Sequence, residues 1–106
     1  MKRIHETKIS PKIIKGKQGS VDTFDIIDDT IQAGIRIVKK NSDVPTRPHI
    51  HPQRQIMYVV DGSGEITNTK ERLPLNAGDF IVLEANEEHY VITHDSELKV
   101  FEIKFP

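Results

Sequence analysis

The sequence has no cysteine, almost no net charge and no long apolar run among its 106 residues. The absence of cysteine excludes disulfide bonds, thiolate metal ligands and a cysteine nucleophile. With a formal net charge of −1, the chain lacks the basic excess of nucleic-acid-binding domains, and we expect no nucleic-acid partner. The charged N-terminal residues are not followed by an apolar stretch, so we expect no signal peptide, no membrane span and a cytoplasmic protein.

A helical pattern of apolar residues is also missing, because no segment keeps one for more than two turns. Short alternating apolar runs between turn residues instead predict an all-β domain, a sandwich or barrel, without internal repeats. Residues 61–64 contain two glycines and are predicted to form a hairpin turn. The predicted strands cover residues 21–29, 31–39, 55–60, 65–69, 72–75, 80–83, 89–93 and 98–105.

The strength of this pattern divides the chain into two regions. Residues 1–30 contain lysines, glycines and short apolar pairs, and we expect an N-terminal arm with short strands that packs on the barrel or on a partner subunit. A disordered tail is the alternative. Residues 31–106 are expected to form the barrel.

Residues 31–39 alternate clearly between two faces. One face carries Ile31, Ala33, Ile35 and Ile37, and we expect it to be the core face, whereas Arg36 lies on a mixed face. Arg36 could point into a cavity or into solvent. Solvent is the more common location for an arginine, and it is the one we expect.

A pair of histidines precedes the predicted strand at residues 55–60. Side chains two residues apart share one face of an extended segment, so His49 and His51 can converge on one ion. Pro48 and Pro52 flank the pair, and proline is confined to strand ends, edges and bends. Two surface histidines that fall two residues apart by chance are the alternative interpretation.

A third histidine strengthens the metal hypothesis. His89 lies 38 residues beyond His51, at the head of a strand that an antiparallel barrel would bring back beside the pair. Three imidazoles and the amide oxygen of Gln55 form a plausible ligand set for a divalent first-row metal, with one or two positions open to water or substrate. Iron, manganese, nickel and zinc all remain candidates.

These residues resemble the first conserved motif of the cupin superfamily, Gly-x5-His-x-His-x3,4-Glu-x6-Gly. His49, His51 and Gly62 match it, Gln55 takes the glutamate position, and Asp43 replaces the leading glycine. The second motif, Gly-x5-Pro-x-Gly-x2-His-x3-Asn, is similar in its spacing. Gly78 and His89 match its first glycine and its histidine. Its proline, second glycine and asparagine are replaced by Glu84, Asn86 and Thr93.

The resemblance implies a double-stranded β-helix, or small jelly-roll barrel, with a metal near its open end and frequently a homodimer. The metal ligands that it implies are His49, His51, Gln55 and His89. Some cupins hold no metal and keep these histidines as polar residues of the cavity wall, which is the alternative.

Gln55 affects the chemistry that such a metal could support. A neutral amide in place of a carboxylate leaves a divalent ion with its full charge, which makes it a better Lewis acid and harder to oxidise. We therefore expect a metal-dependent enzyme that acts on a small oxygen-rich metabolite. A sugar or uronate is favoured, because small cupins that open unsaturated uronate rings show a similar His-x-His-Pro context with a glutamine ligand. An iron-dependent dioxygenase and a non-catalytic module for a small molecule or metal are the alternatives.

Two charged residues are candidates for catalysis. Arg47 shares the strand parity of the histidine pair and could bind a substrate carboxylate, or it could be solvated. Glu102 could project inward as a base, or pair with a lysine outside. The expected partners are a small-molecule ligand or substrate and a second copy of the chain.

Overall fold

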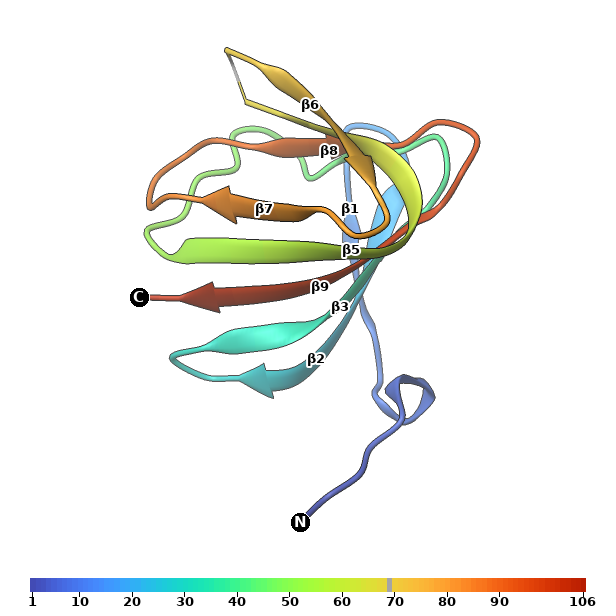
Figure 1. Ribbon diagram of the computed structural model, residues 1–106, viewed down its shortest axis with the longest axis vertical. Coiled ribbons are helices and arrows are strands. Elements are labelled where there is room, and N and C mark those ends of the chain that lie inside the picture. Colours follow the sequence, from blue (N-terminus) through green and yellow to red (C-terminus); the bar gives the residue numbers. More distant parts are fainter. Residues whose placement is uncertain (69) are drawn as a thin grey trace.

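Strands make up most of the molecule (Figure 1). The structure is a computed structural model and describes residues 1–68 and 70–106. Among these residues, no helix is long and apolar enough to cross a membrane. The short 3-10 helix η1 (Glu6–Lys8) is followed by β1 (Lys12–Lys15), β2 (Ser20–Asp28), β3 (Gln32–Val38), β4 (Asp43–Val44), β5 (Arg54–Thr67), β6 (Arg72–Asn76), β7 (Phe80–Leu83), β8 (Tyr90–Ile92) and β9 (Leu98–Phe105).

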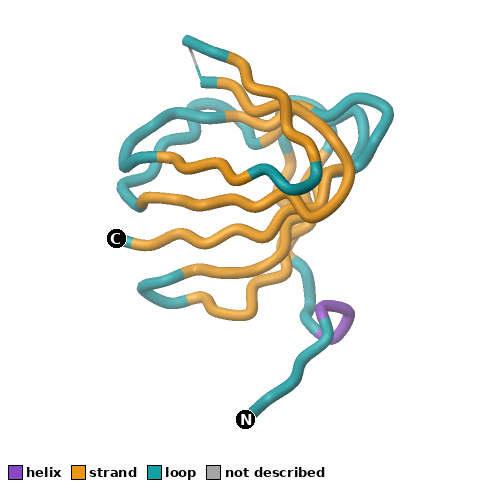
Figure 2. The backbone as a smooth tube through the Cα atoms, in the orientation of Figure 1, coloured by secondary structure: helices purple, strands orange, loops and turns teal. Residues whose placement is uncertain are grey.

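The strands form two antiparallel sheets that share β5. One sheet contains β1, β2, β3, β9, the first half of β5 and β7, and the other contains β4, β8, the second half of β5 and β6. The tube in Figure 2 shows how these strands curve around a common interior. Because one long strand belongs to both sheets, they form a jelly-roll barrel, which confirms the predicted fold class.

The bend in β5 corrects one prediction. Residues 61–64 do not form a hairpin turn, because β5 continues through them and pairs on both sides. A β-bulge lies between Val59 and Asp61, and Gly62 adopts a φ of 84° beside the backbone of Glu97. The bulge and the glycine curve the strand from one sheet into the other instead of reversing it. The strand predicted at residues 65–69 ends on Thr69, which lies outside the described residues.

The faces of β3 are largely the reverse of those predicted, although Ala33 of the predicted core face is buried, at 4% exposure. The inward face carries Arg36 and Val38, which are 8% and 3% exposed, whereas Ile31, just before the strand, is 42% exposed on the outside. The prediction of a solvated Arg36 was therefore wrong. Its charge is buried because Asp25 of β2 and Glu102 of β9, on the two neighbouring strands, both pair with the guanidinium.

The N-terminal region contributes to the first of these sheets. β1 pairs with β2, and β2 pairs with β3, so residues 12–28 extend the sheet that contains β9 and β5. The chain before β1 runs away from the barrel (Figure 1), and an ion pair of 2.6 Å between Glu6 and Lys99 fastens η1 to β9.

The apolar core fills the barrel interior. It includes Val59, Leu75 and Leu98, which have no exposed surface. Other core residues, among them Val21, Val38, Val44, Met57, Val91 and Val100, also line an internal cavity. The same interior therefore supplies both the packing and the walls of the candidate site.

Candidate metal centre

Three histidines from two loops meet at one end of the barrel. His49 and His51 lie in the segment between β4 and β5, and His89 immediately precedes β8. A backbone hydrogen bond of 2.9 Å from Asn86 to the carbonyl of His51 holds the two loops side by side. The ring centroids are 4.6 to 5.3 Å apart and the rings are nearly perpendicular, with their ligand nitrogens all within 4.8 Å of one another.

Backbone carbonyls orient two of these rings. Nδ1 of His51 lies 3.0 Å from the carbonyl oxygen of Gln53, and Nδ1 of His89 lies 2.8 Å from that of Glu87. A carbonyl can only accept, so each Nδ1 carries the proton and donates it. The unprotonated Nε2 atoms are then left to bind a metal, which is the usual arrangement around histidine ligands.

Gln55 completes the donor set at the start of β5. Its side chain is 2% exposed, and its Oε1 lies 3.0 Å from Nε2 of His51. Because the proton of a neutral His51 sits on Nδ1, these two atoms face each other with lone pairs. A cation between them would remove the repulsion, and two ligands at about 2.1 Å from one ion and at right angles are about 3 Å apart. The donor set therefore fits a divalent metal.

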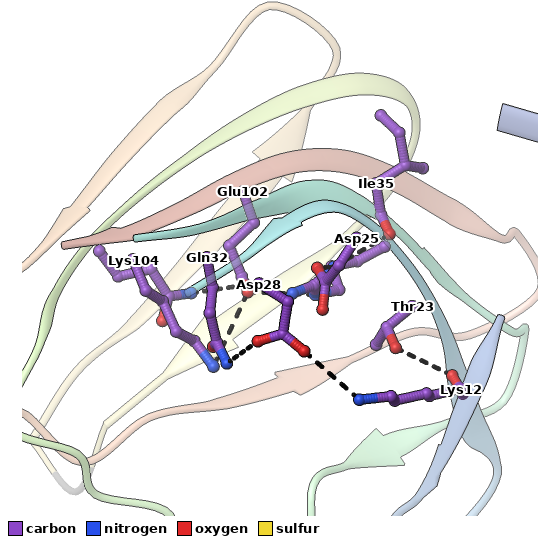
Figure 3. A network of polar contacts seen from close by, with 10 residues as sticks. Lys12, Thr23, Asp25, Asp28, Gln32, Ile35, Glu102 and Lys104 are labelled. Carbon is purple, nitrogen blue, oxygen red and sulfur yellow. Dashed lines mark hydrogen bonds and ion pairs between the residues drawn. The ribbon is translucent and has the colours of Figure 1, made fainter. Parts of the chain in front are cut away.

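A chain of buried charges lies behind Gln55. Its Nε2 donates to Oε1 of Glu102 over 2.7 Å, and Nε of Arg36 donates to Oε2 of Glu102 over 3.1 Å. Nη1 of Arg36 then reaches Asp25 at 2.6 Å. Figure 3 shows Asp25, Glu102 and Lys104 in this network, with Glu102 between the other two. Gly34 lies opposite both Asp25 and Glu102 in the strand register, and a Cβ at this position would collide with the backbone of Phe24 and Asp25, so a glycine is needed for the close approach of β2.

A cavity of about 160 Å³ extends from the histidines into the barrel. His49, His89 and Gln55 lie on its wall together with Glu102 and Lys104. The ammonium of Lys104 is 3.9 Å from Oε2 of Glu102, and its side chain is 21% exposed. Most of the remaining wall is apolar, formed by Ile14, Val21, Val38, Val44, Pro45, Met57, Val91 and Val100.

The site favours neutral imidazoles. Burial, together with the positive charges of His89, Lys104 and His51, lowers the pKa of His49 to about 4. Burial also lowers the pKa of His89, against the opposing effect of its hydrogen bond to the carbonyl of Glu87. The neutral form is the one that binds metals, so protons compete less strongly for these two ligands than for exposed histidines.

The lowered pKa of His49 predicts an acid-sensitive fold in the metal-free protein. Unfolded histidine binds a proton near its ordinary pKa of about 6.5, whereas folded His49 stays neutral down to about 4. The unfolded state therefore binds more protons in this range, and the free energy of unfolding falls as the pH decreases through it. Thermal melts of the wild type and of His49→Asn should diverge between these pH values. Parallel curves would contradict the prediction.

The structure brings together the four predicted ligands His49, His51, Gln55 and His89, and it places Glu102 beside them on the inside of the barrel. Arg47 lies elsewhere. Its guanidinium pairs with Asp43 at 2.5 Å and stacks 3.8 Å above the ring of Tyr90.

Two cavity residues were missed by the sequence analysis, namely Arg36 as a buried residue and Lys104 as part of the site. Strand parity carried a signal for both, since Arg36 is two residues from the buried Val38 and Lys104 is two residues from Glu102. Arginine and lysine are rarely buried, so the sequence analysis did not place these two side chains inside the barrel.

Two bent antiparallel sheets with a histidine cluster at one end and a cavity between them define a small jelly-roll barrel. A family model described as "Cupin domain" matches residues 35–104 of the chain. The chain is therefore a member of this cupin family. No match was found among curated proteins.

Solved structures show the same fold. The polyketide cyclase RemF from Streptomyces resistomycificus is 21% identical with a TM-score of 0.84, over 98% of this chain and 78% of that one. A predicted oxalate decarboxylase from Thermotoga maritima is 17% identical with a TM-score of 0.85, over 98% of both chains. A cupin-like protein from the same organism is 23% identical with a TM-score of 0.75, over 83% of this chain and 70% of that one.

Proposed function

We propose that the chain is a metal-dependent enzyme that acts on a small oxygen-bearing substrate. The observation that carries this proposal is the convergence of three histidine ligand atoms within 4.8 Å, with the amide oxygen of Gln55 beside them. A divalent first-row ion held by this set would supply Lewis acidity toward a carbonyl or hydroxyl oxygen of the substrate. The enzyme names of similar folds, a cyclase and a predicted decarboxylase among them, are consistent with catalysis.

The cavity wall suggests which oxygen compounds fit. A polyhydroxylated sugar or uronate, the substrate class that the sequence favours, would place hydroxyl groups against Val21, Val38 and Val91, where they have no partner. A small carbonyl compound with an apolar body avoids this cost. We therefore propose a short 2-oxo or 3-oxo acid, whose oxygens face the histidines and whose carbon chain lies against the apolar wall.

Lys104 supplies the complementary charge. Lys104 lies on the same cavity wall as His49 and His89, and its positive charge is one of the causes that lower the pKa of both histidines. In the proposed enzyme it binds the carboxylate of the substrate and stabilises the negative charge that develops on the carbonyl oxygen as the proton of the neighbouring carbon passes to a solvent water molecule, which later returns a proton to that carbon.

Exchange of that carbon-bound proton in deuterated water provides a test that needs no knowledge of the product. We expect protein loaded with manganese, nickel or zinc to accelerate exchange in 2-oxobutanoate or acetoacetate. Lys104→Met should reduce kcat/KM by about 100- to 1,000-fold, the usual cost of losing one such donor. Metal content should stay unchanged. The matched control is Lys99→Met, because Lys99 pairs with Glu6 outside the cavity.

Other outcomes would replace the proposal. Exchange that persists after chelation of the metal would exclude the Lewis-acid role. Oxygen uptake that depends on ferrous ion would identify a dioxygenase. An oxo acid that raises the melting temperature without exchange or conversion would identify a binding module.

We also propose that the protein is a homodimer, with the outer face of the larger sheet as its interface. Tyr58 pairs in register with Phe80 on one side and Phe101 on the other, and Ile56 pairs in the same way with Val82 and Ile103. Phe80 and Val82 are 68% and 63% exposed. An exposed apolar face of this kind suits a symmetric contact with its own copy, because the same rows would meet across a two-fold axis.

Light scattering after size-exclusion chromatography tests the dimer. We expect the wild type to have twice the mass of one chain, and Phe80→Lys to have the mass of one, because a lysine cannot be buried there without a partner charge. Leu73→Lys is the control, since Leu73 is also exposed, at 41%, but lies on β6 of the other sheet. A monomeric wild type would disprove the proposal.

A further inference from the structure

The side-chain amide of Gln55 has one end that can bind a metal and one that cannot. Only its oxygen has a free lone pair, and the NH₂ group would instead present two protons to the ion. We propose that Glu102 is a positioning residue that fixes this amide with Oε1 toward the histidines. The inference rests on the metal centre of the proposed function and deepens it.

The hydrogen bond between the two side chains carries the argument. Nε2 of Gln55 donates to Oε1 of Glu102 over 2.7 Å, and both residues are buried, at 2% and 7% exposure. A carboxylate oxygen can only accept, so the NH₂ group must face Glu102. The amide oxygen then lies on the opposite side, 3.0 Å from Nε2 of His51.

Glu102 is itself held in place. Its second oxygen accepts from Nε of Arg36 over 3.1 Å, and Arg36 is anchored in turn by Asp25 at 2.6 Å. One carboxylate oxygen therefore accepts from Gln55 and the other from Arg36, with the ammonium of Lys104 3.9 Å from the second, so the charge is paired. Because β2, β3 and β9 are adjacent in the sheet, this chain of contacts is built into a rigid part of the fold.

This arrangement accounts for the glutamine at the position where the family motif has glutamate. A glutamate at position 55 would put two carboxylates at hydrogen-bond distance with no proton to share, whereas Gln55 and Glu102 form a matched donor and acceptor. Glu102 also polarises the amide, which makes Oε1 a stronger ligand. The negative charge thus lies one hydrogen bond behind the ligand instead of on it.

Exchanging the two residue types separates amide orientation from other effects. In Glu102→Gln, the new side chain must turn its oxygen to Arg36 and its NH₂ group to Gln55. Gln55 then flips and presents its own NH₂ group to the histidines. We expect Co²⁺ affinity, measured by calorimetry and by the visible absorption of the bound ion, to fall by about 10- to 100-fold.

The double variant Gln55→Glu/Glu102→Gln restores a donor opposite an acceptor. The amide introduced at position 102 donates to the carboxylate introduced at position 55, while its oxygen accepts from Arg36. Co²⁺ binding should therefore recover to the wild-type level or better. Gln55→Glu alone should have a lower melting temperature without metal than either the wild type or the double variant. Asp25→Asn is the control, because it weakens the ion pair behind Arg36 but leaves the bond between Gln55 and Glu102 in place.

The outcomes distinguish this inference from the metal proposal. Wild-type affinity in Glu102→Gln, or no recovery in the double variant, overturns the positioning role. Additive melting temperatures in the metal-free proteins also overturn it, because the two side chains would then not interact. Non-additive melting temperatures with no Co²⁺ binding by the wild type would instead overturn the metal centre and confirm the hydrogen bond alone.

Discussion

His89→Ala should abolish tight binding of a first-row metal. His89 is the most buried of the three histidines, at 4% exposure, and its ring is fixed by the carbonyl of Glu87. Its loss removes one of the four donors, so we expect affinity to fall by more than the roughly 10- to 100-fold that is typical for residues behind the ligands. Elemental analysis and calorimetry with Co²⁺ or Ni²⁺ measure the effect directly.

The matched control for this substitution is His94→Ala. His94 is also a histidine near β8, but it is exposed and pairs with Glu65 at 2.9 Å outside the cavity. In the wild type and the control, metal at about 100 times its Kd should stabilise the native state by about 2.7 kcal/mol, and in His89→Ala this increase should vanish. Equal metal content in all three proteins would show that the histidines are only residues of the cavity wall.

Most of the candidate site was predictable from the sequence because its ligands lie at short, regular spacings. His49, His51 and Gln55 are within seven residues, and strand parity puts the two histidines on one face. His89 is distant in the chain, but it starts a strand that an antiparallel barrel must bring back to the same end. The donor set could be assembled without knowing any side-chain contact.

The interior behind the ligands could not be predicted in this way. Three isoleucines among residues 31–37 suggested a core face, yet none of them is buried, and Ile35 lies in register with Phe101 on the apolar surface that we propose as the dimer interface. Hydrophobicity alone does not distinguish a core from a subunit contact. In the same way, two glycines at residues 61–64 fit a hairpin, and only the pairing of both halves of β5 reveals a curved strand.

The burial of Arg36 depends on partners that no local pattern identifies. Asp25 is eleven residues earlier in the chain and Glu102 is sixty-six residues later, and each belongs to a different neighbouring strand. An arginine can be buried only where such partners satisfy its charge and its donors. The placement of Arg36 is therefore a property of the assembled sheet.

Arg36→Met should be strongly destabilising for the same reason. Removing the guanidinium leaves the carboxylate of Asp25 without its cation and leaves Glu102 with only the more distant ammonium of Lys104, at 3.9 Å, and breaking a buried ion pair from one side costs about 3–5 kcal/mol. Urea unfolding of the metal-free protein measures the free energy of unfolding. Arg54→Met is the control, since Arg54 is exposed, stacks on Phe105 and should cost less than about 1 kcal/mol.

A triple variant identifies the source of this cost. If unpaired charge is responsible, Arg36→Met combined with Asp25→Asn and Glu102→Gln should recover much of the lost stability, because neutral amides tolerate burial better than carboxylates do. If lost packing of the arginine stem is responsible, the triple variant should be no more stable than the single one. The triple variant should still bind metal more weakly than the wild type, because the amide introduced at position 102 can again turn its NH₂ group toward Gln55. Recovery of the fold without recovery of metal affinity would thus separate the two roles of this buried network, which are balancing charge in the core and orienting the amide ligand.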